Sequence, residues 1–380
     1  MQPESPEPFV TNLPKRNTYL HPIGCRAVLK SIPFITKDGI MNISNTANTW
    51  LSQFKIEVTS NANRVFGNGR QQLEATVSVS PRGNGTITTE QLNSITLVTL
   101  DDDGVYRELT HELRVSRTRD TLFDYYAASG SAPLAHLELK GAVLRQRFYI
   151  SSSRVGGSLD RVYARISKNA DTHHVTDGGA FNSSIIIESL TPLRYEHEDF
   201  VLTREDTVSK HDTDIDIYYL TFKAPGRRII KSIPYDPVWS GIDVWSTQAG
   251  RRRKSRWPSA AQVSPSGGEQ TPRHHSYYSD CYSRQTSVTG TDYRFYYIHY
   301  AIEMGTALTL RIKDSTITVN NKPGHMNFVR AKTYYGPFEN PPNEYRQQSR
   351  WGLLDPYGNE TRIELTQGDS GNTIAFKRYD

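Results

Sequence analysis

The sequence contains little cysteine and no long apolar run. Its two cysteines, Cys25 and Cys281, are too few for a disulfide-stapled secreted scaffold, and the sequence leaves open whether they form one bridge or stay free. No segment approaches the ~20 apolar residues of a membrane-spanning helix. The N-terminus is polar and rich in proline, unlike a secretory signal peptide. We therefore expect a soluble chain that reaches an extracellular or particle-associated location, if it does, by a non-classical route.

The chain also lacks a general excess of charge. It has 45 lysines and arginines against 40 aspartates and glutamates, which gives a net charge of +5. The excess equals the five cations of one short run, Arg251, Arg252, Arg253, Lys254 and Arg256. Domains that bind duplex nucleic acid distribute basic residues over a whole face. The composition therefore argues against nucleic acid as a partner.

No sequence motif assembles a catalytic or cofactor site. The stretch Gly368–Gly371 reads GDSG, as around the nucleophile of serine proteases, but no upstream stretch supplies the base that this nucleophile needs. We interpret it as the turn of a hairpin. Phosphate-cradling and dinucleotide-binding glycine motifs are missing as well. The sequence thus predicts no catalytic residue and no cofactor.

The candidate metal ligands lack a metal-binding pattern. Asp212, Asp214 and Asp216 alternate along a predicted strand without the turn that a calcium loop requires, and we expect them to line an edge or a solvent-facing side. The pairs His173-His174 and His274-His275 have no spaced cysteine–histidine framework for zinc. No metal site is predicted. Acidic clusters in turns keep a glycan-active enzyme open as an alternative, because glycoside hydrolysis uses two carboxylates.

Short alternating apolar runs broken by turn residues dominate the sequence. In RVYARIS, for example, Val162, Ala164 and Ile166 share one face of a predicted strand. Residues 306–321 and the C-terminal tail each predict a hairpin, and TTEQLNS (88–94) predicts a single helical turn. The predicted fold class is all-β, with tandem antiparallel sandwiches, a long basic loop rich in serine and proline, and a β-rich C-terminal region.

Changes of composition suggest five segments. They are an extended N-terminal arm (1–24), a first β-sandwich (25–139), a second β-sandwich (140–235), a linker or long loop (236–290) and a C-terminal β-rich domain (291–380). The prolines of the arm are incompatible with a helix. Its apolar residues Phe9, Val10 and Leu13 are candidates for docking on a neighbouring subunit. This arm predicts a homo-oligomer or a subunit of a larger particle.

The basic run is the second candidate for an interaction. Like charges in a block stay solvated and form interaction loops, and Trp257 adds a flat face beside Arg251–Arg256. A solvated loop, contact with an acidic partner surface, proteolytic processing and weak nucleic-acid binding are the readings that the run allows.

The spacing of the strands over about residues 25–235 resembles tandem immunoglobulin-like modules of bacterial surface proteins and of phage or phage-tail-like particles. This resemblance implies a non-enzymatic structural or binding protein that contacts other protein subunits or a glycan. Tyrosine and tryptophan in its strands and loops suit recognition of such surfaces. The alternatives are a secreted β-rich toxin of pore-forming type, which alone would involve a membrane, and the glycan-active enzyme.

Overall fold

The structure of the 380-residue chain is a computed structural model. It describes residues 47–127, 143–177, 180–236, 239–240, 273–285, 292–335, 345–346 and 349–379. Within this part of the chain nearly every element is a strand, so the predicted all-β class is confirmed. Two α-helices are described, α1 (Ala47–Trp50) and α2 (Thr89–Asn93). No helix among these residues is long and apolar enough to cross a membrane.

The helix α2 confirms the helical turn predicted at 88–94. Thr88 and Gln91 form a capping box, in which each side chain bonds the backbone N–H of the other residue. This reciprocal bonding satisfies two amide groups that a helix start leaves without an intrahelical partner. A capped turn of this length connects two strands without needing a core of its own.

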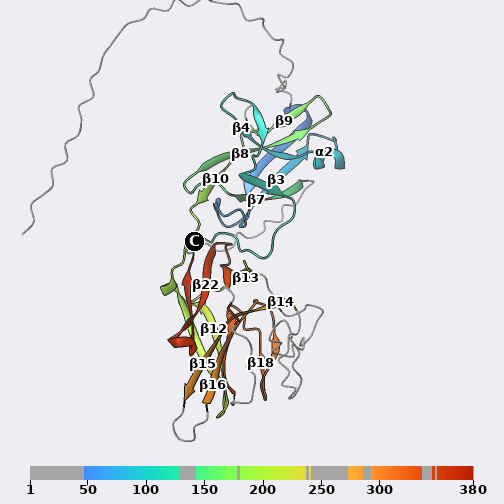
Figure 1. The fold of residues 1–380 in the computed structure, drawn as a ribbon. Coiled ribbons are helices and arrows are strands. Elements are labelled where there is room, and N and C mark those ends of the chain that lie inside the picture. The colour runs from blue at the N-terminus through green and yellow to red at the C-terminus, as the bar shows by residue number, and fades with distance from the viewer. Residues whose placement is uncertain are drawn as a thin grey trace, which may run out of the picture. The chain divides into compact units, whose positions relative to one another are not determined.

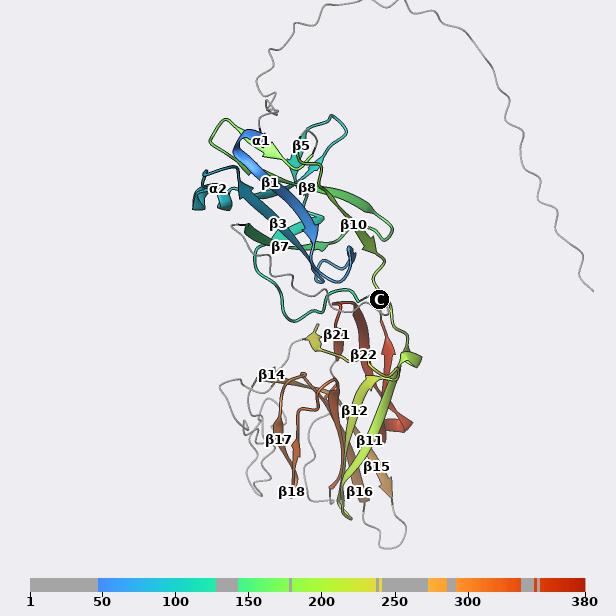
Figure 2. The ribbon, with the colours of Figure 1, turned by 180° about the vertical axis from the view of Figure 1, so that it is seen from behind.

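Residues 51–190 form two stacked sheets around one apolar core (Figures 1 and 2). The first sheet has the order β1 (Leu51–Val58), β3 (Leu73–Pro81), β7 (Leu144–Ser152), β6 (Leu113–Ser116). The second has the order β2 (Arg64–Phe66), β10 (Ile185–Leu190), β8 (Leu159–Ser167), β4 (Thr96–Leu100), β5 (Tyr106–Glu108), with β9 (His173–Val175) beside β8. The parallel pairing of β2 with β10 departs from the expected antiparallel arrangement. Val162, Ala164 and Ile166 lie together in this core, as the alternation predicts.

The described strands do not divide at residue 140, where the sequence pattern suggests a boundary between sandwiches. β7 lies beyond this position, yet it pairs with β3 and with β6. Phe148 and Ile150 of β7 join Phe54 and Val77 in the same core. Short strands of similar composition show which face is buried but do not reveal their partners, so the boundary could not be read from alternation.

Residues 195–379 form a second stacked arrangement (Figures 1 and 2). Its larger sheet has the order β11 (Phe200–Ser209), β12 (Thr213–Phe222), β19 (Met326–Tyr335), β16 (Asp292–Ile302), β15 (Arg273–Gln285), β14 (Trp239–Ser240), with β20 (Tyr345–Arg346) beside β15. The smaller sheet has the order β13 (Lys231–Pro234), β21 (Arg350–Leu354), β22 (Glu360–Gly368), β23 (Thr373–Arg378). A separate hairpin consists of β17 (Leu308–Ile312) and β18 (Ser315–Val319).

The strand β12 shows why three layers result. Its residues Tyr218, Leu220 and Phe222 pack with the smaller sheet, whereas Ile215 and Ile217 pack with the β17–β18 hairpin. Alternate residues of a strand point to opposite faces, so the larger sheet has apolar cover on both sides. The hairpins predicted at 306–321 and in the C-terminal tail are both confirmed.

Two further expectations differ from the structure. The range 236–290 is predicted to be a linker or long loop, but it contains β15, which pairs with β16 along most of its length. The aspartates of β12 are predicted to line an edge or a solvent-facing side, but β12 lies between β11 and β19. Asp216 is completely buried there, with 0% exposure.

Candidate functional site

The interaction candidates chosen from the sequence lie outside the described residues. This holds for the arm residues Phe9, Val10 and Leu13 and for the basic run with its tryptophan, which comprises Arg251, Arg252, Arg253, Lys254, Arg256 and Trp257. The structure neither places them nor brings them together. Their roles therefore remain predictions.

The GDSG stretch forms the turn of a hairpin, as predicted. Asp369–Gly371 is one turn of 3-10 helix between β22 and β23. Asp369 and Gly371 both have positive φ, at 45° and 91°, as a tight reversal requires. The turn lies over buried polar groups, because the Gly371 carbonyl bonds Nε2 of His299 at 3.0 Å.

The aspartates of β12 belong to a buried ion network. Carboxylate oxygens of Asp206, Asp214 and Asp216 lie within 4.8 Å of one another. However, Nη1 of Arg330 donates to Asp214 at 2.7 Å and to Asp216 at 2.8 Å, and Nε of Arg204 donates to Asp216 at 2.8 Å. These guanidinium groups already supply the positive charge that a metal ion would bring to the carboxylates.

The two histidines of β9 face different surroundings, as expected for neighbours on a strand. Nδ1 of His173 lies 2.8 Å from the hydroxyl of Ser167. The ring of His174 is buried and packs 5.6 Å from the ring of Trp50. Burial lowers the pKa of His174, and the nearby Lys168 lowers it further. This pair does not form a chelating site. The side chains of His274, His275 and Cys281 lie outside the described residues.

A pocket of about 300 Å³ lies at one end of the β22–β23 hairpin. We call it the arginine–tyrosine pocket. Its lining comes from the start of β22, the end of β23 and the segment before β11, and consists of Arg194, Tyr195, Glu360, Thr361, Arg362, Arg378 and Tyr379. Its volume is at the lower end of the range for small-ligand sites. Three cations and one anion make it a site with net positive charge.

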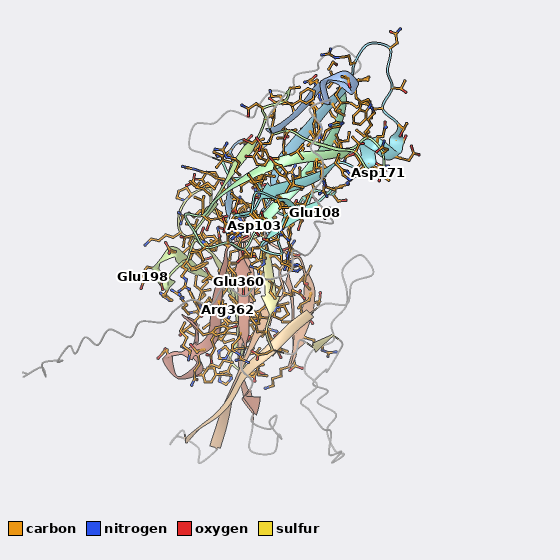
Figure 3. The ribbon with its side chains drawn as sticks, turned by 90° about the horizontal axis from the view of Figure 1, so that it is seen from above. Asp103, Glu108, Asp171, Glu198, Glu360 and Arg362 are labelled. Carbon is orange, nitrogen blue, oxygen red and sulfur yellow. The ribbon has the colours of Figure 1, made fainter. Side chains whose placement is uncertain are left out.

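Strand alternation places the charged residues of β22 away from the core. Ile363 and Leu365 are core residues, so Glu360 and Arg362 project from the opposite face of the same strand. Both residues are labelled in Figure 3. Gly352 of β21 lies directly opposite Arg362. A Cβ atom at Gly352 would approach Oε1 of Glu360 to 2.7 Å and the ring of Tyr235 to 3.1 Å. The glycine therefore makes room for both side chains over β21.

Glu360 is held by three donors. Nη2 of Arg70 donates to Oε2 at 2.6 Å, Nε of Arg362 donates to Oε1 at 3.3 Å, and the Tyr235 hydroxyl also donates to Oε1. Burial acts to raise the pKa of Glu360, but these donors outweigh burial and lower it. The carboxylate is therefore ionised at neutral pH. It accepts hydrogen bonds and repels a second negative charge.

The three arginines of the pocket differ in their interaction partners. Arg362 contacts Glu360, and Arg378 is paired with Glu196. Arg194 is exposed and makes no ion pair or hydrogen bond with any described residue. A guanidinium group presents five donors in a planar fork that suits carboxylate and phosphate groups. Arg194 is thus the cation in the lining whose donors are all available to a ligand.

The neutral residues of the lining are fixed in different ways. The hydroxyl of Tyr195 donates to Oδ2 of Asp355 at 2.7 Å, and the residue is buried, so its ring forms a rigid wall. Tyr379 is partly exposed, and its ring meets that of Tyr235 edge to face at 6.2 Å. Thr361 is only 4% exposed, and its hydroxyl has no hydrogen-bond partner among the described residues. Thr361 lies opposite the core residue Leu353 of β21, so its side chain is on the core face of β22, away from Glu360 and Arg362.

The lining of this pocket was not predicted from the sequence. Its residues come from separated segments, and the pair Glu196–Arg378 spans 182 positions. The predicted C-terminal hairpin carried one usable signal, because it sets Arg362 on the face away from the core, next to Tyr379. The contribution of Arg194 and Tyr195 required the tertiary fold.

No model of a protein family matches this chain, and no curated protein matches it.

Proposed function

We propose that the chain is a non-enzymatic structural or binding protein built from immunoglobulin-like β-sandwich modules, and that the arginine–tyrosine pocket holds an anionic group of a partner. The partner is another protein subunit or a glycan on the surface of a bacterial or phage-like assembly. The observation that carries this proposal is the combination of three arginines in one pocket, of which Arg194 has no partner among the described residues.

Binding suits this pocket better than catalysis. Glu360 is the one carboxylate among the described lining residues, and three donors keep it ionised. Hydrolysis of a glycoside requires two carboxyl groups, one of which carries a proton at the working pH. An ionised Glu360 is not that proton donor, and the described residues of the lining include no second carboxyl group. The glycan-active enzyme is therefore the weaker hypothesis for this site.

The test is fluorescence anisotropy with two labelled anionic probes, a glutamate-rich peptide and a polyuronic acid. We expect the protein to bind at least one of them, and we expect Arg194→Gln to weaken this binding about tenfold or more, because a charged hydrogen bond contributes about 1.5–3 kcal/mol. Arg194→Gln breaks no hydrogen bond or ion pair with another described residue, and Arg194 is exposed, so we expect the fold to be kept.

Two controls separate the pocket from the rest of the surface. Lys377→Gln removes an exposed cation of β23 that lies outside the pocket lining and pairs with Glu364, and it should leave binding unchanged. The second variant has glutamine at Arg251, Arg252, Arg253, Lys254 and Arg256. If this second variant loses binding while Arg194→Gln retains it, the basic run is the anion-binding element and the proposal for the pocket is wrong. Binding of neither probe also overturns it.

A further inference from the structure

The pocket combines three kinds of groups that one class of ligand would use together. Its arginines suit an anionic group, its carboxylate suits a ligand hydroxyl group, and Tyr379 adds a partly exposed aromatic ring. An inorganic anion would use only the arginines. The other groups of the lining therefore indicate the chemistry of the rest of the ligand.

The charge of the ligand is limited by Glu360. This carboxylate is ionised and lies in the same lining as the arginines, so it opposes a doubly charged group such as phosphate. A singly charged carboxylate pairs with Arg194 at a lower repulsive cost. A carboxylate has about four lone-pair sites, and the donors of Arg70, Arg362 and Tyr235 use three of those on Glu360. One site remains for a ligand hydroxyl group.

From these groups we infer that the ligand of the arginine–tyrosine pocket is a carboxylated saccharide of the uronic-acid type. Its carboxylate pairs with Arg194 and one of its hydroxyl groups bonds Glu360. The apolar face of its ring packs on Tyr379, since an aromatic side chain offers an apolar surface beside a polar handle. This inference rests on the proposed function, because it names the class of partner that the same pocket binds.

The test is saturation-transfer-difference NMR with the full chain and three probes, each at up to ~10 mM, which covers the millimolar dissociation constants expected of a single sugar. The probes are the methyl glycoside of glucuronic acid, the methyl glycoside of glucose and a short glutamate peptide. We expect signals for the glucuronide and none for the glucoside or the peptide. In the glucuronide, ring protons near Tyr379 should receive the strongest saturation.

One variant and one control make the result specific. Arg194→Gln should weaken glucuronide binding about tenfold or more. Lys377→Gln, outside the lining, should not change it.

The outcomes distinguish this inference from the function on which it rests. If the peptide binds and the glucuronide does not, the pocket holds an anionic group of a protein, and the saccharide inference is overturned while the proposed function stands. Equal binding of glucoside and glucuronide overturns the role of the carboxylate. If no probe binds in this assay or in the anisotropy assay, both proposals fail.

Discussion

Replacing Arg330 by methionine should destabilise the second module strongly. Arg330 is 1% exposed, and its Nη1 bonds Asp214 and Asp216, of which Asp216 has 0% exposure. Removing one partner of a buried ion pair leaves an uncompensated charge, which costs about 3–5 kcal/mol. A cooperative unit of about 150–250 residues would then melt about 6–20 °C lower. Urea titration and thermal melting, followed by circular dichroism, measure both quantities.

Arg204→Met is the matched control, because Arg204 donates to the same carboxylate at 2.8 Å but its side chain is 46% exposed. Water takes over much of the role of an exposed guanidinium group, so we expect this variant to lose no more than about 1 kcal/mol. If Arg330→Met lowers the free energy of unfolding as little as Arg204→Met does, burial of Arg330 adds nothing to its ion pairs, and our account of the buried aspartates is refuted.

The pH dependence of Arg330→Met provides a second test. Burial raises the pKa of Asp216, while Arg204 and Arg330 act to lower it. Loss of Arg330 raises this folded-state pKa further, and a carboxyl whose pKa is raised on folding destabilises the protein above its unfolded pKa. Burial lowers the pKa of His299 to about 3, and Arg330 also disfavours its charged form. Both groups accept a proton more easily in the variant, so its stability deficit should shrink between pH 7 and about pH 4.5. A deficit that grows with acid would contradict this reasoning.

Three further predictions concern other parts of the chain. Gly352→Ala should cost about 1–3 kcal/mol in a urea titration and weaken ligand binding, because its Cβ would lie 2.7 Å from Glu360 Oε1; an unchanged stability would mean that the crowding over β21 is not real. Limited trypsin digestion, read by mass spectrometry, should cut first within Arg251–Arg256 and leave two associated fragments, whereas earlier cuts in the sheets would show that this run is protected. Deletion of residues 2–16 should reduce the mass in solution by light scattering if Phe9, Val10 and Leu13 dock on a neighbour; a full-length protein that is already monomeric at micromolar concentration excludes arm exchange.

Local features of the fold could be predicted from the sequence because they depend on near neighbours. The alternation of Val162, Ala164 and Ile166 identified a buried face, and the residue pattern of 88–94 identified α2. Hairpins such as β17–β18 join strands only a few residues apart, so their pairing is set by the turn.

Long-range pairing could not be predicted in the same way. Nothing local in β7 specifies β3 as its partner, and the burial of Asp216 depends on Arg330, which is 114 positions away. Charged residues at alternate strand positions ordinarily indicate a solvent-facing side, and this rule failed where a distant guanidinium group compensated the charge. The arginine–tyrosine pocket could not be predicted either, because its lining also joins residues that are far apart in the sequence.

The pocket is organised before a ligand arrives, and this decides how its residues share the binding energy. Glu360 is fixed by three donors and Tyr195 by Asp355, so neither loses much freedom when a ligand binds. Arg194, by contrast, has no partner among the described residues, and binding must immobilise it. The fixed groups therefore set which ligands fit, while the contact of Arg194 supplies attraction that only an anionic ligand can use. On this argument a neutral saccharide of the same shape would meet the fixed groups correctly and still bind weakly.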